Sequence, residues 1–238
     1  MLAIFSNDIV SGPQELIDAG SRTPSPKTNA SDLLETFISR YPTAVSARVG
    51  TEAYMSYTHE NQPLLQPRSF AMKEEMMCLF KGSLENYGRL RQEYGLGKNG
   101  NEVLLVMEAY KALRDRAPYP ATHMVAHLLG QFAFVIFDNS TSTVFVASDQ
   151  EGRVPLFWGI TKDGYLAFAD DVELLKASCG KSLASFPPGC YLWRASELKS
   201  YEHPKNKVTA VPATEEEICG ATFKVERPHL CTSLGVDI

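Results

Sequence analysis

The sequence predicts a layered α+β fold in which helices cover antiparallel β-sheet structure. Its N-terminal run LAIF, residues 2–5, is apolar and fits a strand that begins at once. Two later segments repeat apolar residues at the spacing of a helix, and the middle of the chain holds four aromatic and β-branched segments separated by short turns. Runs such as FAFVIF and VFVA are apolar at every position, so we expect their sheet to be covered on both sides.

The segment after the first strand, residues 11–30, is rich in Ser, Pro, Gly and Thr and lacks both the helical and the strand period. We therefore expect an exposed loop there. The Ser25-Pro26 pair within it fits a kinase target, but it fits an ordinary polar turn better, because such short motifs have low specificity.

Three segments fit helices, because each places apolar residues on one stripe and has a plausible start or stop signal. They are residues 33–38 after an N-cap at Ser31, residues 103–110 before Pro118, and a segment from Asp170, with Glu173 in the capping-box position, to Gly180.

Four central segments fit strands of an antiparallel meander, because turn-rich stretches such as DNSTS and TKDG separate them. They are residues 131–138, 143–149, 155–160 and 165–170. We expect residues 1–238 to form one domain, with residues 228–238 as a flexible tail.

Composition excludes several classes of protein. The formal net charge is -5 and no basic stripe is present, which argues against a nucleic-acid partner. No apolar run approaches the roughly 20 residues of a transmembrane helix, and no signal peptide is evident. The five cysteines are widely spaced and form no zinc motif, so we expect reduced thiols in a cytoplasmic, possibly also nuclear, protein without metal or cofactor.

Two short motifs and several longer segments carry resemblances to known families. The motifs YGL (residues 94–96) and LRDR (residues 113–116) resemble those of the plant stem-specific or aluminium-induced proteins. More distantly, residues 78–193 resemble the glutaminase domain of asparagine synthetase. The matching segments are CLFKGSLENYGRLRQEYG, GQFAFVIFD, SDQEGRVPLFWG and FPPGCYLW, in that order.

This second resemblance implies a four-layer αββα sandwich of the N-terminal-nucleophile hydrolase type. In that family, an N-terminal cysteine exposed by removal of the initiator methionine attacks the amide of glutamine. The family motif opens M-C-G-I-F, whereas this chain opens MLAIF, so Leu2 occupies the nucleophile position. The resemblance therefore implies that glutaminase activity is lost.

Other positions of the resembling glutaminase site also depart from the family. The asparagine that donates to the oxyanion aligns with Lys81, while the adjacent glycine remains as Gly82. The acidic residue that holds the substrate amine aligns with Gly100, next to Asn101, which can still hydrogen-bond. The substrate-carboxylate arginine lies in a segment that does not align. We take Lys81, Gly82 and Asn101 as candidates for a remnant ligand pocket, together with one arginine from the set Arg40, Arg48 and Arg68, with Arg68 preferred.

The LRDR motif ends the second predicted helix with Arg114, Asp115 and Arg116. It fits a solvated helix terminus with local ion pairs, and it fits equally a docking surface in which the arginines, beside Tyr119, bind a carboxylate or phosphate.

Other nucleophiles are less favoured. Cys78 lies in an apolar segment, and Cys190 has no histidine nearby in sequence. His123 and His127 have the i, i+4 spacing of metal ligands but lack the glutamate of H-E-x-x-H, so two structural histidines fit better.

These observations leave three hypotheses. The first is a non-catalytic domain, expected as a homodimer, that binds a small ligand or a protein. The second is an amidohydrolase with another nucleophile or another substrate. The third is a structural stress-response protein that acts by association.

Overall fold

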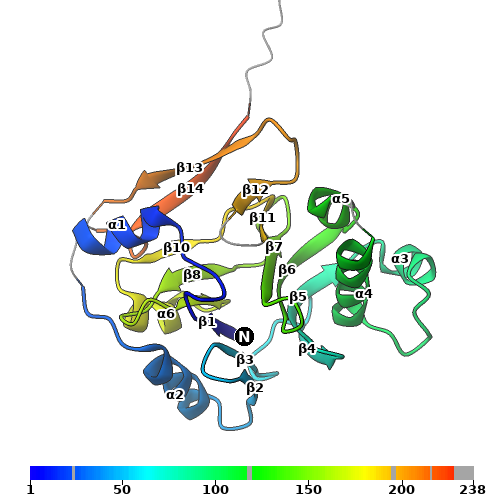
Figure 1. Cartoon of the computed structure of the whole chain (residues 1–238), viewed down its shortest axis with the longest axis horizontal. Coiled ribbons are helices and arrows are strands. Elements are labelled where there is room, and N and C mark those ends of the chain that lie inside the picture. The colour runs from blue at the N-terminus through cyan, green and yellow to red at the C-terminus, as the bar shows by residue number, and fades with distance from the viewer. Residues whose placement is uncertain (23–24, 117–119, 194–196, 215, 228–238) are drawn as a thin grey trace, which may run out of the picture.

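The computed structural model describes residues 1–22, 25–116, 120–193, 197–214 and 216–227. Two six-stranded sheets, in which every pairing is antiparallel, dominate these residues (Figure 1). The first sheet has the order β10-β8-β9-β1-β3-β2, with β10 at Leu183–Ser185, β8 at Phe157–Ile160, β9 at Leu166–Ala169, β1 at Leu2–Phe5, β3 at Ala53–Tyr57 and β2 at Val45–Val49. The second has the order β12-β11-β7-β6-β5-β4, with β12 at Glu197–Ser200, β11 at Cys190–Trp193, β7 at Thr143–Ser148, β6 at Gly130–Asp138, β5 at Met76–Leu84 and β4 at Arg68–Lys73.

The two sheets pack face to face around a shared apolar core. Phe5 of the first sheet contacts Phe137 of the second, with ring centroids 5.6 Å apart. Trp158 is fully buried between Phe168 and Phe186 in the same core. Alternating side chains of each strand point into this core, and the intervening ones point outward to the helices.

Helices cover both outer faces. The helices α2 (Ala30–Arg40) and α6 (Val172–Cys179) pack on the first sheet, with Leu33 and Phe37 of α2 fully buried. On the second sheet lie α3 (Tyr87–Glu93), α4 (Glu102–Asp115) and α5 (Ala121–Ala126), and Figure 1 shows these three together on one side. The predicted four-layer αββα sandwich is thereby confirmed.

The predicted exposed loop at residues 11–30 is wrong over much of its length. Residues Gln14–Arg22 form the helix α1, and Leu16 and Ala19 are buried against the core between the sheets. α1 lies beside a two-stranded hairpin, β13 (Lys207–Pro212) and β14 (Ala221–Glu226). The apolar stripe of α1 is narrow, so the helix depends on this tertiary packing more than on its own period.

The predicted four-strand meander is also wrong, because it divides into two hairpins in different sheets. β6 pairs with β7 in the second sheet, and β8 pairs with β9 in the first. Between them the chain crosses from one sheet to the other at residues 149–156. The buried carboxylate of Asp149 holds this crossing, because it accepts hydrogen bonds from the backbone N–H groups of Phe132, Glu151, Arg153 and Val154.

Helix starts differ from the prediction by one or two residues. The N-cap of α2 is Asn29, in a capping box with Asp32, and not Ser31. The N-cap of α6 is Asp171, whose side chain accepts from the N–H of Glu173, and not Asp170.

The YGL motif has a structural role at the end of α3. Tyr94 is the C-cap, and Gly95 follows with a φ of 67° in the left-handed region. The N–H of Gly95 donates to the Gln92 carbonyl at 3.1 Å, and the N–H of Leu96 donates to the Arg91 carbonyl at 2.9 Å. These two bonds define a Schellman motif, which explains why a glycine stands at the second position of YGL.

Candidate functional site

An ion cluster surrounds the buried carboxylate of Asp170. The α-amine of Met1 donates to Asp170 Oδ1 at 2.6 Å. The other oxygen, Oδ2, accepts from Arg68 Nε at 2.6 Å and from Lys81 Nζ at 2.9 Å. The side chains of Lys81 and Asp170 are only 5% and 2% exposed. Three cationic groups therefore share one carboxylate in an environment that contains little water.

The two sheets jointly position this cluster. Asp170 immediately follows β9, and Met1 immediately precedes β1, which pairs with β9. Arg68 and Lys81 lie directly opposite each other in the β4–β5 pair. Since Leu79 belongs to the core between the sheets, Lys81, two residues further along β5, points to the same side. The cluster thus lies between the sheets, where the chain begins in Figure 1.

Electrostatics keep Asp170 ionised. Burial alone would raise the pKa of its carboxyl group, but the Met1 amine, Lys81 and Arg68 together hold that pKa well below its usual range. Burial lowers the pKa of the Met1 amine, and Asp170 opposes that shift. Arg68 is tied down further, because its Nη1 donates to the Glu60 carbonyl at 2.9 Å.

The nucleophile position carries no reactive group. Leu2 is 1% exposed and packs with Ile4 in the apolar layer beneath α2 and α6. Its side chain therefore points to the helical layer, away from the core between the sheets. A hydrocarbon side chain in such a layer contributes packing and cannot attack an amide.

The two predicted oxyanion-hole positions are both engaged within the protein. Lys81 Nζ binds Asp170, so its charge is already paired. The N–H of Gly82 donates to the Pro67 carbonyl at 3.0 Å. Gly82 has a φ of 122°, and a Cβ there would lie 2.0 Å from the Gln131 carbonyl oxygen, so only glycine fits. The ligand-binding roles of both residues stay predictions.

Of the remaining candidates for the ligand pocket, one lies in the Asp170 cluster and the others lie elsewhere. Arg68 joins the Asp170 cluster. Asn101 is the N-cap of α4, and its side-chain oxygen accepts from the Leu104 N–H at 3.1 Å. Arg40 pairs on the surface with Asp171 at 2.8 Å, and Arg48 is exposed on β2. The structure therefore brings together Lys81, Gly82 and Arg68, and it gives Asn101 a helix-capping role.

Sequence reasoning missed Asp170 as a site residue, because Asp-Asp before an amphipathic segment fits a helix N-cap. The cap is the second aspartate, Asp171, which is partly exposed. A weak signal was available, because the predicted strand YLAFAD ends in a charged residue directly after buried positions, which calls for a buried partner.

Three of the four cysteines that the structure describes are poor nucleophiles, because they are buried. Cys78, Cys179 and Cys190 are buried. Burial raises the pKa of Cys78, and it raises the pKa of Cys179 and of Cys190 to about 12. Their thiolates are therefore scarce at neutral pH. Cys231 lies outside the described residues.

The histidines within the described ranges do not belong to a cluster of metal-ligating side chains. Over the described ranges, no three His, Cys, Asp or Glu side chains lie close enough together to hold a metal ion. His123 is part of α5 and His127 is its C-cap.

The LRDR motif connects α4 to the β6–β7 hairpin. Arg114 Nη1 donates to Asp138 Oδ2 at 3.2 Å, and Tyr110 donates to the same oxygen at 3.1 Å. Asp138 is fully buried, so these bonds satisfy a carboxylate that has no access to solvent. Asp115 pairs with Arg114 at 2.7 Å, and Arg116 is the exposed C-cap. The docking role stays a prediction, and Tyr119 lies outside the described residues.

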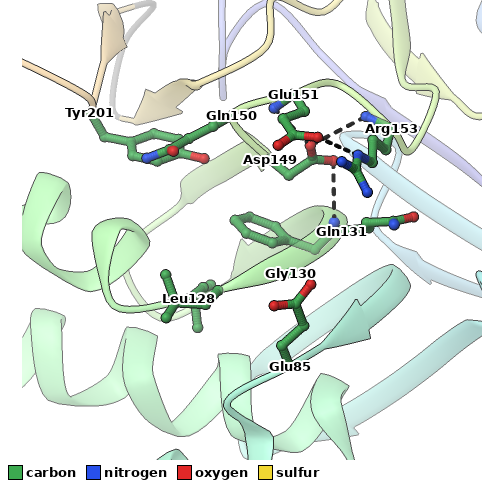
Figure 2. A pocket seen from close by; sticks show the side chains of 11 residues that line it. Glu85, Leu128, Gly130, Gln131, Asp149, Gln150, Glu151, Arg153 and Tyr201 are labelled. Atoms are coloured by element: carbon green, nitrogen blue, oxygen red, sulfur yellow. Dashed lines mark hydrogen bonds and ion pairs between the residues drawn. The ribbon is translucent and has the colours of Figure 1, made fainter.

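A separate cavity of about 230 Å³ opens where β5 ends, β6 begins and the chain crosses between the sheets (Figure 2). Glu85, Leu128, Gln131, Gln150 and Tyr201 are among its lining residues, and none of them belongs to the Asp170 cluster.

Comparison with known proteins first shows which class of protein the chain resembles. The chain is 29% identical over 142 residues to the glutamine-hydrolyzing asparagine synthetase B of Escherichia coli strain K12, covering 58% of this chain and 24% of that enzyme. It therefore resembles the glutamine amidotransferase part of these synthetases and spans about a quarter of their length.

The family follows from a match over nearly the whole chain. The family model described as aluminium induced protein matches residues 2–225, so the chain belongs to this family. It is also 38% identical over 149 residues to the stem-specific protein TSJT1 of Nicotiana tabacum, covering 62% of this chain and 99% of that protein. Among solved structures, glutamine phosphoribosylpyrophosphate amidotransferase from B. subtilis, complexed with ADP and GMP, is similar with a TM-score of 0.48 and 16% identity, covering 67% of this chain and 37% of that one.

In the part of the chain that the structure describes, no helix has the length and apolarity needed to cross a membrane.

Proposed function

We propose that this protein is a non-catalytic member of the glutamine-amidotransferase-like class, which acts in plant stress, hormone or metal responses by binding a ligand or a protein, as a homodimer. The proposal needs no nucleophile, and it retains the sandwich as a binding scaffold. Membership of the aluminium-induced family supports the physiological setting.

One observation carries the proposal: the Asp170 cluster fills the place where the chain begins. Glutaminase chemistry of this class needs a thiol on the first residue of the mature chain and a free amine beside it. Here the amine of Met1 is bound to Asp170 at 2.6 Å, and Leu2 points into the helical layer. The cation at Lys81 is bound to the same carboxylate, so it is not available to an oxyanion.

The test is release of ammonia and glutamate from glutamine and asparagine by the purified protein. We expect no turnover above a heat-killed control, while the glutaminase domain of an asparagine synthetase, assayed in parallel, is active. The variant Leu2→Cys, Ala3→Gly, with its methionine removed, should also stay far below that positive control because Lys81 and Asp170 still occupy the site. Turnover by the natural protein would show that another residue attacks the amide and would refute the proposal.

The homodimer is tested by light scattering at micromolar concentration. We expect a mass near twice the 26.3 kDa of the chain. A mass of one chain at all concentrations would remove the dimer from the proposal and leave the binding role.

The alternative, an amidohydrolase with another nucleophile, is favoured by one contact. Lys27 Nζ lies 2.5 Å from Ser182 Oγ, and burial lowers the pKa of Lys27. Serine–lysine pairs serve as nucleophile and base in some hydrolases. However, Ser182 is fully buried, and α1 covers it so closely that a Cβ on Gly20 would lie 2.0 Å from its hydroxyl oxygen.

A fluorophosphonate probe distinguishes this alternative from the non-catalytic proposal. Labelling of the natural protein that disappears in Ser182→Ala would support the hydrolase, because the probe reacts only with an activated hydroxyl. We expect no labelling of either protein.

A further inference from the structure

The cavity in Figure 2 combines an apolar floor with polar groups on its walls. Leu128 and Phe132 are buried side chains of its lining, and the ring of Tyr201 is buried beside them. Glu85 rises from the end of β5 on one side, and Gln150 lies on the opposite side. This mixture of apolar contact and a few polar groups is typical of small-molecule sites.

Most polar groups of this cavity are already engaged within the protein. The carboxylate of Asp149 accepts four backbone N–H groups. Glu151 and Arg153 form an ion pair with each other. The side-chain oxygen of Gln131 accepts from Gln66 at 3.2 Å. The Tyr201 hydroxyl donates to the Ser148 carbonyl at 2.9 Å.

Two of the side chains that line the cavity form no polar contact with the rest of the described protein. Within the described part of the chain, neither the Glu85 carboxylate nor the Gln150 amide forms a hydrogen bond or an ion pair. Glu85 is fixed at its backbone, because its N–H donates to the Leu129 carbonyl at 2.8 Å. Both side chains are exposed at the cavity. The cavity therefore presents one unpaired, solvent-exposed negative charge on a residue whose backbone is held in place, and across from it one neutral, exposed amide (Figure 2).

This pattern defines the chemistry of a ligand. A carboxylate beside buried apolar and aromatic side chains favours an ammonium or guanidinium group attached to an apolar body. The volume of about 230 Å³ lies below the range of roughly 300–1,000 Å³ usual for drug-sized ligands, so the ligand is smaller than those. We propose that this cavity binds a small organic cation, with its charged group at Glu85, its apolar body over Leu128 and Phe132, and a polar end at Gln150.

The site is separate from the Asp170 cluster, so the proposal does not depend on the absence of glutaminase activity. It names neither a metal nor an anion, because the cavity offers one unpaired carboxylate and no unpaired cation among the described lining residues.

The experiment uses two probes of equal size on the full, isotopically labelled chain. The first, 5-aminopentanamide, carries an ammonium group, a four-carbon chain and an amide. The second, hexanamide, replaces the ammonium group by a methyl group. Backbone amide shifts are followed by NMR at neutral pH and low salt, for the natural protein, for Glu85→Gln, and for Glu35→Gln as a control at an exposed glutamate on α2.

We expect the amine to shift the amides of residues 129–132 and 149–151 in the natural protein and in Glu35→Gln. Glu85→Gln should weaken binding about threefold to fivefold, because it removes an ion pair at a solvent-exposed carboxylate. Hexanamide should bind about threefold to fivefold more weakly than the amine for the same reason. The proposal would be overturned by equal affinity for both probes or by unchanged binding of the amine to Glu85→Gln. It would also be overturned if the amine caused no shifts up to about 10 mM, because that concentration would detect even millimolar affinity.

Discussion

Asp170 is the residue that holds together the ion cluster between the two sheets. Its carboxylate accepts from the Met1 amine, Arg68 and Lys81, and each of these cations has lost most of its contact with water. A buried ion pair adds little net stability when it is intact, but removal of one partner leaves a buried charge uncompensated. At Asp170 that removal affects three cations at once.

We therefore predict that Asp170→Asn is strongly destabilising. The free energy of unfolding, measured in urea, should fall by about 3–5 kcal/mol, the range found when one partner of a buried pair is removed. The neighbouring change Asp171→Asn is the control, because its pair with Arg40 is exposed and asparagine also caps helices. It should cost less than about 1 kcal/mol. Equal losses in the two variants would contradict the role given to Asp170.

The depressed pKa of Asp170 gives a prediction for acid. A carboxyl group whose pKa is lower in the folded than in the unfolded state binds more protons when unfolded, so stability rises with pH in that range. The contribution of Asp170 is complete above its unfolded pKa, near 3.8, and is lost as the pH falls below that value toward the folded pKa.

The difference in unfolding free energy between the natural protein and Asp170→Asn should thus be constant from pH 7 to about 5 and shrink below about 4. Urea unfolding at steps of pH measures it. A difference that is independent of pH down to about 3 would show that the asparagine acts through packing rather than charge.

Elements differ in how fully the sequence predicts them. The strands β6 and β7 and the helix α4 were predicted within a few residues, because long apolar runs and a wide helical stripe are strong signals. α1 was missed because its buried face consists of Leu16 and Ala19, and Gly20 follows directly. That glycine is required for close approach to Ser182, a long-range contact that no local pattern records.

The YGL motif offers a test at the scale of one helix, because replacement of two glycines by alanine should change stability in opposite directions. Gly95 has a φ of 67°, and a Cβ added there would meet no atom within 4 Å, so Gly95→Ala should cost only the conformational strain of about 1–2 kcal/mol. Gly88 lies inside α3, also with open space, and Gly88→Ala should stabilise by about 0.5–1 kcal/mol. Thermal unfolding compares the two variants. A gain at Gly95 would contradict the Schellman assignment, and a loss at Gly88 would contradict the open helical environment given to that residue.

At the scale of the whole molecule, the sequence predicted the layered architecture but not where the chain crosses from one sheet to the other. The apolar strands required cover on both faces, and the sandwich supplies it. The split of the predicted meander depends on Asp149, whose four backbone hydrogen bonds turn the chain from one sheet into the other. The Asp170 cluster was equally hidden, because its members come from three separate parts of the chain and meet only when both sheets have formed.

Since the shared core joins the two sheets, we expect them to unfold together. Phe137 of the second sheet contacts Phe5 of the first and is 1% exposed. Phe137→Ala should reduce the free energy of unfolding by about 3–5 kcal/mol through lost burial and a residual cavity. In a Trp193→Phe background, which removes the tryptophan of the second sheet, Trp158 fluorescence reports on the core from the first sheet, and far-UV circular dichroism reports on the whole chain. Both midpoints should fall by the same amount in urea, although the substitution lies in the second sheet. If the Trp158 transition kept its natural midpoint while the circular dichroism shifted, the sheets would be separate cooperative units and the expectation of one domain would be wrong.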